Sequence, residues 1–292
     1  MKEADEKIVR DYEQNENPDN NLSYHDHEHT EDVVNLANKI IKNLDFENDS
    51  DRHHTAGLAV IAAAMHDIHK SWHEKQVADS NGNIRMVRAD GIDPKNGEPS
   101  TDEDESALVA KSLMQKYNID NGQIFSQDEI DTVVEAIRSS KTTMDSDYVI
   151  HHPQITAESP LIARVLALAD IGRAGYHPGS FLGDGDKLFV EQNLDVSRRL
   201  REVKDTPLAE AEQRMFAWRI LDWSFTQIKI AQGLKDHLID EVCDGLTDQQ
   251  KTDISSVLSH FDQSIESARI QYNQRFVIYQ NGDYAELIDS VY

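Results

Sequence analysis

The spacing of hydrophobic residues along the chain is mostly helical. Between residues 33 and 44 they recur at steps of three and four, which is the period of a helix and not the alternation of a strand. The residues concerned are Val33, Val34, Leu36, Ala37, Ile40, Ile41 and Leu44. Similar stretches predict helices over 54–70, 103–117, 127–139, 159–174, 186–203 and about 208–241, then a mostly helical tail from Thr247 with a break near Asn281-Gly282.

Strand-like runs do not alternate with these helices, so we expect an all-α fold and no parallel sheet. Two polar stretches interrupt the pattern. Residues 71–102 predict a long loop or a small hairpin around Asn81-Gly82, and 176–185 predict a loop. A weak boundary near Asp205-Thr206-Pro207 divides the chain into a helical bundle over 1–205 and a C-terminal helical extension over 206–292. We expect this extension to pack on the bundle.

A histidine-rich stretch, YHDHEHT, precedes the helix that contains residues 33–44. Continued backward in steps of four, the apolar stripe of that helix reaches His29 and then His25. Ser23 and Asp26, three residues apart, resemble a capping pair at the helix start. We therefore expect these residues to form the first turns of the helix, with His25 and His29 facing the core and His27 at the edge or outside.

The charge of the chain restricts its partners. It has 292 residues, with 29 Lys and Arg against 54 Asp and Glu, a net charge of −25. Extended contacts with nucleic-acid phosphates or anionic membranes need a basic surface, so neither is expected. The single cysteine, Cys243, allows no internal disulfide. The N-terminus has no apolar signal segment and no apolar run is long enough for a membrane span, so we expect a cytoplasmic protein.

Histidine and aspartate also lie at the ends of otherwise apolar helices. His66 and Asp67 follow a run of small apolar residues, and Asp170 follows the apolar stretch 161–169. A carboxylate at the end of a core helix is costly to bury unless it is paired or bound to a metal. Together with His29 these residues supply two imidazoles and two carboxylates, which suit Mn, Fe, Co, Ni or Zn better than an all-oxygen Mg or Ca site.

The order of these residues resembles the H…HD…D signature of the HD-domain superfamily of metal-dependent phosphohydrolases. The stretch YHDHEHTEDVV is similar to the Y-H-N-x-x-H-x-x-D-V motif of cyclic-nucleotide phosphodiesterases within that superfamily. The resemblance covers roughly residues 20–190. It implies a catalytic HD-domain bundle that binds one or two divalent transition-metal ions, with Mg as a further option, through His29, His66, Asp67 and Asp170.

The same resemblance implies roles for four residues around the metal. His25 would be the acid that protonates the leaving oxygen, and Asp67 would orient the metal-activated hydroxide. The run HDIHK is similar to the H-D-I-G-K of many HD proteins, in which the lysine contacts a phosphate, so Lys70 would bind substrate. His69 replaces the usual glycine and is a candidate ligand for a second metal.

Three further groups have weaker indications. Asp102–Glu105 open a predicted helix; some HD hydrolases carry an acid here that holds metal-bound water, but a favourable interaction with the helix dipole is an equally simple explanation. His151-His152 are interpreted as surface or packing residues. An aromatic cluster on the helix over 208–241 is interpreted as core packing; it contains Trp218, Trp223 and Phe225.

The leading functional hypothesis is therefore a hydrolase of a phosphoester bond in a nucleotide or small phosphorylated metabolite. The alternatives are a di-iron oxygenase of the same superfamily, which needs more ligand histidines, and a regulatory or binding module with a structural metal. Residues 71–102 and the C-terminal helices are candidate surfaces for a partner or a homodimer.

Overall fold

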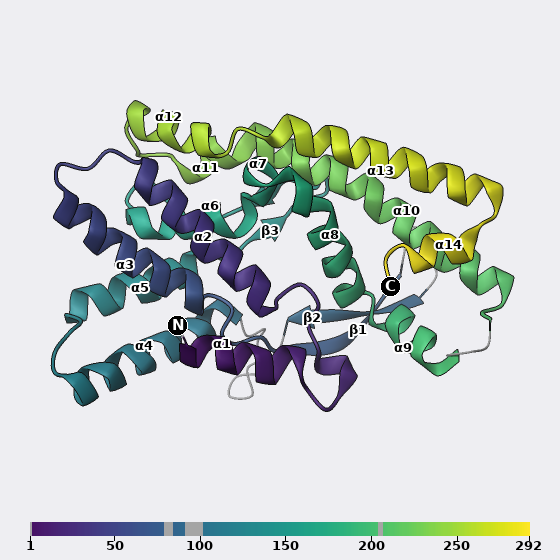
Figure 1. Ribbon diagram of the computed structural model, residues 1–292, viewed down its shortest axis with the longest axis horizontal. Helices are drawn as coiled ribbons and strands as arrows, with labels where there is room; N and C mark the ends of the chain where they lie inside the picture. Colours follow the sequence, from purple (N-terminus) through teal and green to yellow (C-terminus); the bar gives the residue numbers. More distant parts are fainter. Residues whose placement is uncertain (1, 79–83, 91–101, 204–206) are drawn as a thin grey trace.

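The computed structural model describes residues 2–78, 84–90, 102–203 and 207–292, and it is built almost entirely from helices (Figure 1). In these residues the strands form only two antiparallel pairs. The predicted all-α fold class is confirmed. None of the helices described has the length and apolar character that a membrane span requires.

In chain order the helices are α1 (Lys2–Ile8), α2 (His27–Asn43), α3 (Asp49–Met65), α4 (Asp102–Asn121), α5 (Gln127–Ser139), α6 (Leu161–Ile171), α7 (Arg173–Tyr176), α8 (Pro178–Gln192), α9 (Leu194–Val203), α10 (Glu210–Gly233), α11 (Ile239–Val242), α12 (Asp248–Val257), α13 (Phe261–Asn281) and α14 (Tyr284–Asp289). Shorter helical turns are η1 (Val9–Glu13), η2 (Pro18–Asn20) and η3 (Leu234–Leu238). The strand pairs are β1 (Trp72–Ala78) with β2 (Ile84–Asp90), and β3 (Thr143–Met144) with β4 (Ile150–His151).

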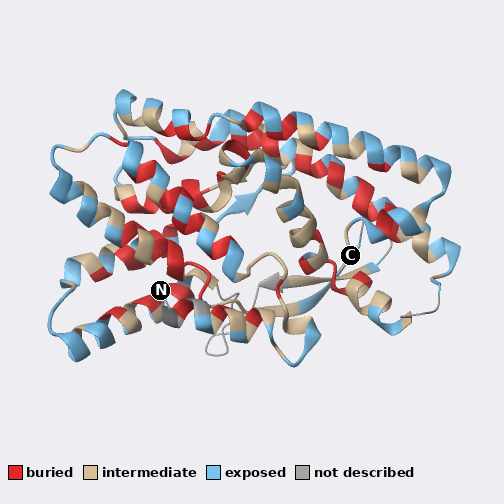
Figure 2. Ribbon diagram, in the orientation of Figure 1, coloured by how far each residue is buried: buried red, intermediate tan, exposed pale blue. Residues whose placement is uncertain are grey.

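The main hydrophobic core lies between α2, α3, α5 and α6. Figure 2 shows buried residues concentrated where α2, α3 and α6 face one another. The apolar stripe of α2 is buried as its spacing predicts, and three consecutive alanines of α3, residues 62–64, let neighbouring helices approach closely. Leu238, Val242 and Ile254 from the C-terminal part belong to the same core. The division at residue 205 stays a prediction.

Helix α6 passes through the centre of this core and also buries an arginine. The Arg164 side chain is almost completely buried, and its guanidinium donates hydrogen bonds to the carbonyl oxygens of Ser159, Thr156 and Val242. A buried guanidinium is tolerated because these carbonyls satisfy its N–H groups. The same bonds fix α6, which carries Asp170 in its last turn, against the loop that precedes it and against α11.

A second hydrophobic cluster joins the long helices α10 and α13, which run side by side in Figure 1, to α8, α9 and α14. Phe189, Phe216 and Ile220 are buried in it. The core interpretation of the aromatic cluster is wrong for two of its three members, because Trp218 and Phe225 are 40% and 44% exposed. Trp223 instead packs against Phe189 and donates a hydrogen bond to the Gly185 carbonyl oxygen.

The polar stretch after α3 forms the hairpin β1–β2, with Trp72 opposite Asp90, so the hairpin alternative is confirmed. The Asn81-Gly82 turn lies outside the described residues. The loop predicted over 176–185 is wrong, because α8 begins at Pro178, a residue well suited to a first helical turn. Its glycines suggested a loop, but Gly185 lies in the helix where a Cβ would collide with the Gln227 amide.

Helix α2 also begins later than predicted. Asp26 is its N-cap, and the Asp26 carboxylate accepts a hydrogen bond from the His29 N–H at 2.8 Å. Ser23 takes no part in this cap and donates instead to the Lys187 carbonyl oxygen. His25 therefore lies in the bend before the helix and not in its first turn, whereas His27 is exposed, as expected.

Candidate metal centre

Side chains from three helices converge at one point in the bundle. His29 lies in the first turn of α2, His66 and Asp67 directly follow α3, and Asp170 lies in the last turn of α6. The His29 Nε2 atom is 3.4 Å from Asp67 Oδ2 and 3.3 Å from Asp170 Oδ1. His66 Nε2 is 3.0 Å and 3.5 Å from the same two oxygens. The four residues of the predicted ligand set therefore lie together.

The orientation of His66 suits a metal ligand. Its Nδ1 lies 2.8 Å from the Ala63 carbonyl oxygen, and a carbonyl only accepts, so Nδ1 carries a proton and Nε2 is the atom that faces the carboxylates. The Nε2 atoms of His29 and His66 are shielded from solvent. Carboxylate oxygens lie close to them, but no contact with a described residue has the angles of a hydrogen bond. Burying nitrogen atoms without hydrogen-bond partners costs free energy, and a cation bound between them and the carboxylates would offset this cost.

The electrostatics of the cluster lead to the same conclusion. Burial alone would lower the pKa of His66, but the Asp67 and Asp170 carboxylates outweigh it and raise the pKa to about 10. The pKa of His29 is raised for the same reason, and the pKa values of both carboxyl groups are lowered by the histidines. The two carboxylates thus favour a positive charge between the helices, either on the histidines or on a bound cation. His29, His66 and Asp170 have ligand atoms within 4.8 Å of one another, and two nitrogens with carboxylate oxygens fit a divalent transition metal.

Lys70 is connected to this cluster through Asp67. Its Nζ lies 2.8 Å from Asp67 Oδ1, so one carboxylate oxygen faces the histidines and the other faces the ammonium. This carboxylate outweighs the effect of burial and raises the pKa of Lys70. The Lys70 backbone N–H donates to the Tyr12 hydroxyl at 2.6 Å, and that hydroxyl donates to the Ile68 carbonyl oxygen. The turn after α3 is therefore held by the N-terminal segment.

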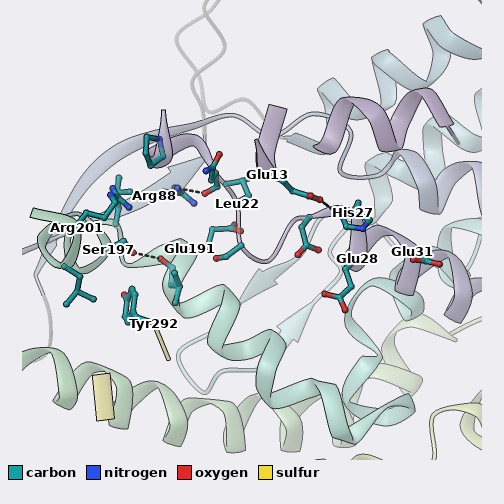
Figure 3. Close-up of a pocket in the computed structure, with 17 residues that line it drawn as sticks. Glu13, Leu22, His27, Glu28, Glu31, Arg88, Glu191, Ser197, Arg201 and Tyr292 are labelled. Carbon is teal, nitrogen blue, oxygen red and sulfur yellow. Dashed lines mark hydrogen bonds and ion pairs between the residues drawn. The ribbon is translucent and has the colours of Figure 1, made fainter. Parts of the chain in front are cut away.

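Asp170, but not His29, His66 or Asp67, lines a cavity of about 430 Å³. Asp170, Lys70 and His25 line it, as do the aromatic side chains of Trp72, Phe181 and Trp223. A larger cavity of about 930 Å³ lies beside it, between the N-terminal segment and α8–α9 (Figure 3). The four candidate ligands do not line the larger cavity, but Leu22, Arg88 and Glu191 line both.

His25 is held at the wall of the smaller cavity by Glu191, a residue that sequence reasoning missed. The His25 Nδ1 atom lies 2.6 Å from Glu191 Oε1 and donates to it, while Glu191 Oε2 accepts from the backbone N–H groups of Tyr24 and His25. These bonds outweigh burial and lower the pKa of Glu191 to about 2. His25 Nε2 is left free of this pair, with the His25 ring 5.9 Å from the His29 ring.

Two of the four acids at the start of α4 also line the cavity. Asp102 Oδ1 accepts hydrogen bonds from the Ser71 N–H and hydroxyl, and burial raises the pKa values of Asp102 and Glu103. Asp104 instead pairs with Arg138 at 3.0 Å. The helix-dipole explanation alone does not account for Asp102 and Glu103. A role in holding metal-bound water stays a prediction.

The other histidines do not join the cluster in the described part of the chain. His69 is outside the group of potential ligands and does not line the cavity; its backbone N–H donates to the Ser106 hydroxyl. Its role at a second metal stays a prediction. His151 pairs with Glu241 and Asp145, and His152 is 1% exposed, which agrees with surface and packing roles.

Comparisons of the chain with models of protein families, with curated proteins and with solved structures give no match. The arrangement of the side chains is therefore the basis for a functional hypothesis.

Proposed function

We propose that this chain is a metal-dependent hydrolase that cleaves a phosphoester bond in a nucleotide or another small phosphorylated metabolite. The observation that carries the proposal is the convergence of His29, His66, Asp67 and Asp170 beside a cavity that Asp170, His25 and Lys70 line. A metal site alone fits many functions. A metal site with a histidine and a lysine in the same cavity fits phosphoryl chemistry.

The proposed mechanism assigns a role to each of these groups. A divalent ion held by the four ligands supplies a Lewis acid and water that ionises near neutral pH. Asp67 accepts a proton or hydrogen bond from the attacking water and orients it. Lys70, already fixed by Asp67, neutralises charge that develops on the phosphate oxygens. His25 donates the proton from Nε2 to the leaving oxygen, while Glu191 holds the ring in place by accepting the hydrogen bond from Nδ1.

The alternatives make different demands on the site. A di-iron oxygenase needs further histidine ligands, and the group found among the described residues contains two. A module with a structural metal needs neither an open cavity nor the His25–Glu191 pair. The cavity of about 430 Å³ and this pair therefore favour a catalytic role.

The test combines elemental analysis with turnover. Protein loaded with Mn should release phosphate, or open a cyclic nucleotide, from some members of a broad phosphoester panel. Asp67→Ala should abolish this activity, and His25→Ala should lower kcat by about a hundredfold or more with the metal content unchanged. His53→Ala is the matched control, because His53 is an exposed histidine of α3. Metal-loaded protein without any turnover would reject the proposal, and two irons bound by histidines other than His29 and His66 would favour the oxygenase.

A further inference from the structure

Arg88 is a partly buried cation that forms no salt bridge with a carboxylate in the part of the chain that the structure describes. It lies on β2 and lines both cavities, as Figure 3 shows for the larger one. Its Nη2 donates to the carbonyl oxygens of Asp19 and Asn21. Its Nε and Nη1 are shielded from water and have no hydrogen-bond partner. A guanidinium in this state is costly, because desolvated N–H groups lose their bonds to water without replacement.

The carboxylates nearest in the fold are engaged elsewhere. Glu74 is the cross-strand partner of Arg88 in the hairpin, but it pairs with Arg198 at 2.6 Å. The Asp19 carboxylate pairs with Arg198 at 2.8 Å and with Arg201. Three arginines thus surround one aspartate in a chain whose net charge is −25.

Two more contacts define the surroundings of Arg88. Its guanidinium carbon lies 4.8 Å from the centre of the Trp72 ring, which occupies a diagonal position on the same face of the hairpin. Glu191 also faces Arg88, but both of its oxygens accept hydrogen bonds from Tyr24 and His25. Trp72, Glu191 and Arg88 all line the cavity that contains Asp170, so a ligand at the metal cluster shares its space with this guanidinium.

We propose that Arg88 binds a second phosphate group of the substrate. The substrate would then be a small molecule with two phosphates, one at the metal cluster and one at Arg88, with a planar group against the aromatic side chains. This inference rests on the proposed function. Arginine is the side chain best suited to phosphate oxygens, and the Arg88 guanidinium belongs to the lining of the cavity that Asp170 also lines. Elsewhere the acidic surface repels such a ligand.

The test is calorimetric titration of the Mn-loaded full chain with adenosine 3′,5′-bisphosphate and with adenosine 5′-monophosphate, which differ only in the second phosphate. We expect the bisphosphate to bind at least about tenfold more tightly, and Arg88→Gln to reduce this preference by about tenfold to a hundredfold, as for a lost charged hydrogen bond. Arg199→Gln is the matched control: Arg199 pairs with Glu202 and Glu212 and lines neither cavity. Its expected effect is below about twofold.

The outcomes separate the two proposals. No preference for the bisphosphate in the unsubstituted chain, or an equal preference in Arg88→Gln, overturns the role of Arg88, whatever the protein hydrolyses. A preference that depends on Arg88 without hydrolysis of any phosphoester supports the binding site and rejects the hydrolase. If circular dichroism shows that Arg88→Gln is unfolded, Arg88→Met is tested instead, because it keeps an unbranched side chain against Trp72. We expect the same loss of preference for the bisphosphate in this variant.

Discussion

The candidate metal cluster and the surroundings of Arg88 meet at one cavity, which Asp170 and Arg88 both line, but they are built in different ways. His29 and Asp170 lie in the end turns of the core helices α2 and α6, and His66 and Asp67 lie in the turn that directly follows α3. Arg88 lies on a two-stranded hairpin and is positioned by carbonyl oxygens of the N-terminal segment and by one tryptophan. We therefore expect the first region to be held by the packing of the core helices. The second region depends on contacts between peripheral elements.

The largest expected effect concerns the metal cluster. Addition of Mn to the metal-free chain should raise the free energy of unfolding by about 3–4 kcal/mol at free metal about 100 to 1,000 times the dissociation constant, because the ion binds only the folded cluster. His66→Ala should remove this increase, whereas Arg88→Gln should keep it. Urea unfolding with and without metal measures the increase in each variant. If Mn still stabilises His66→Ala to the same extent, the cluster is not the site that binds the metal.

Native-state hydrogen exchange tests the contrast in rigidity directly. Amides of α6, which is buried over residues 162–169, should exchange only through global unfolding. Amides of β1 and β2 should exchange through local opening, at a free energy lower by about 3 kcal/mol, because the strands form an isolated pair with few buried residues. Equal protection of the two regions would show that the hairpin is as firmly held as the core.

Glu191 connects the two regions, and its effect should depend on pH. Its pKa falls from 4.5 to about 2 on folding, so the ionised carboxylate stabilises the fold above about pH 4.5, and this stability is lost as the pH falls toward 2. Glu191→Gln should therefore lower the free energy of unfolding by about 3 kcal/mol near neutral pH, with the difference shrinking below about pH 4.5. Urea unfolding of both chains across this range provides the measurement, and a difference independent of pH would contradict the assignment.

The smallest effect on stability is expected for a substitution in α3, the helix that directly precedes His66 and Asp67. Gly57 lies inside α3, and no atom lies within 4 Å of the position that a Cβ would take. Gly57→Ala should raise the free energy of unfolding by about 0.5–1 kcal/mol through helix propensity, with Mn affinity unchanged. Thermal unfolding and metal titration check the two parts, and a changed Mn affinity would show that α3 adjusts more freely than the comparison assumes.

Sequence patterns were informative where the structure depends on local spacing. The all-α class and the positions of α2 and α5 follow from apolar periodicity. His29, His66, Asp67 and Asp170 could be grouped because each interrupts or ends an apolar helix. The resemblance to the HD-domain superfamily and its catalytic implications stay predictions.

The remaining parts depend on contacts between distant segments. Glu191 meets His25 from 166 positions away, and no local pattern distinguishes it from the other acids of an acidic chain. Arg88 and Asp19 come together through a hairpin whose pairing the sequence left open. The glycines of 176–185 resembled a loop because the close contact between Gly185 and Gln227, which explains the small residue, is visible only after α8 and α10 pack.

The hydrogen bonds of Tyr12 have a practical consequence for anyone who shortens or labels this protein. A chain that begins after residue 12 would lose the hydroxyl that bridges Lys70 and Ile68, and with it the support under the loop that presents the ammonium to the cavity. Affinity tags and fusion partners are therefore better attached at the other terminus, and an N-terminally trimmed version is a poor substitute for the full chain.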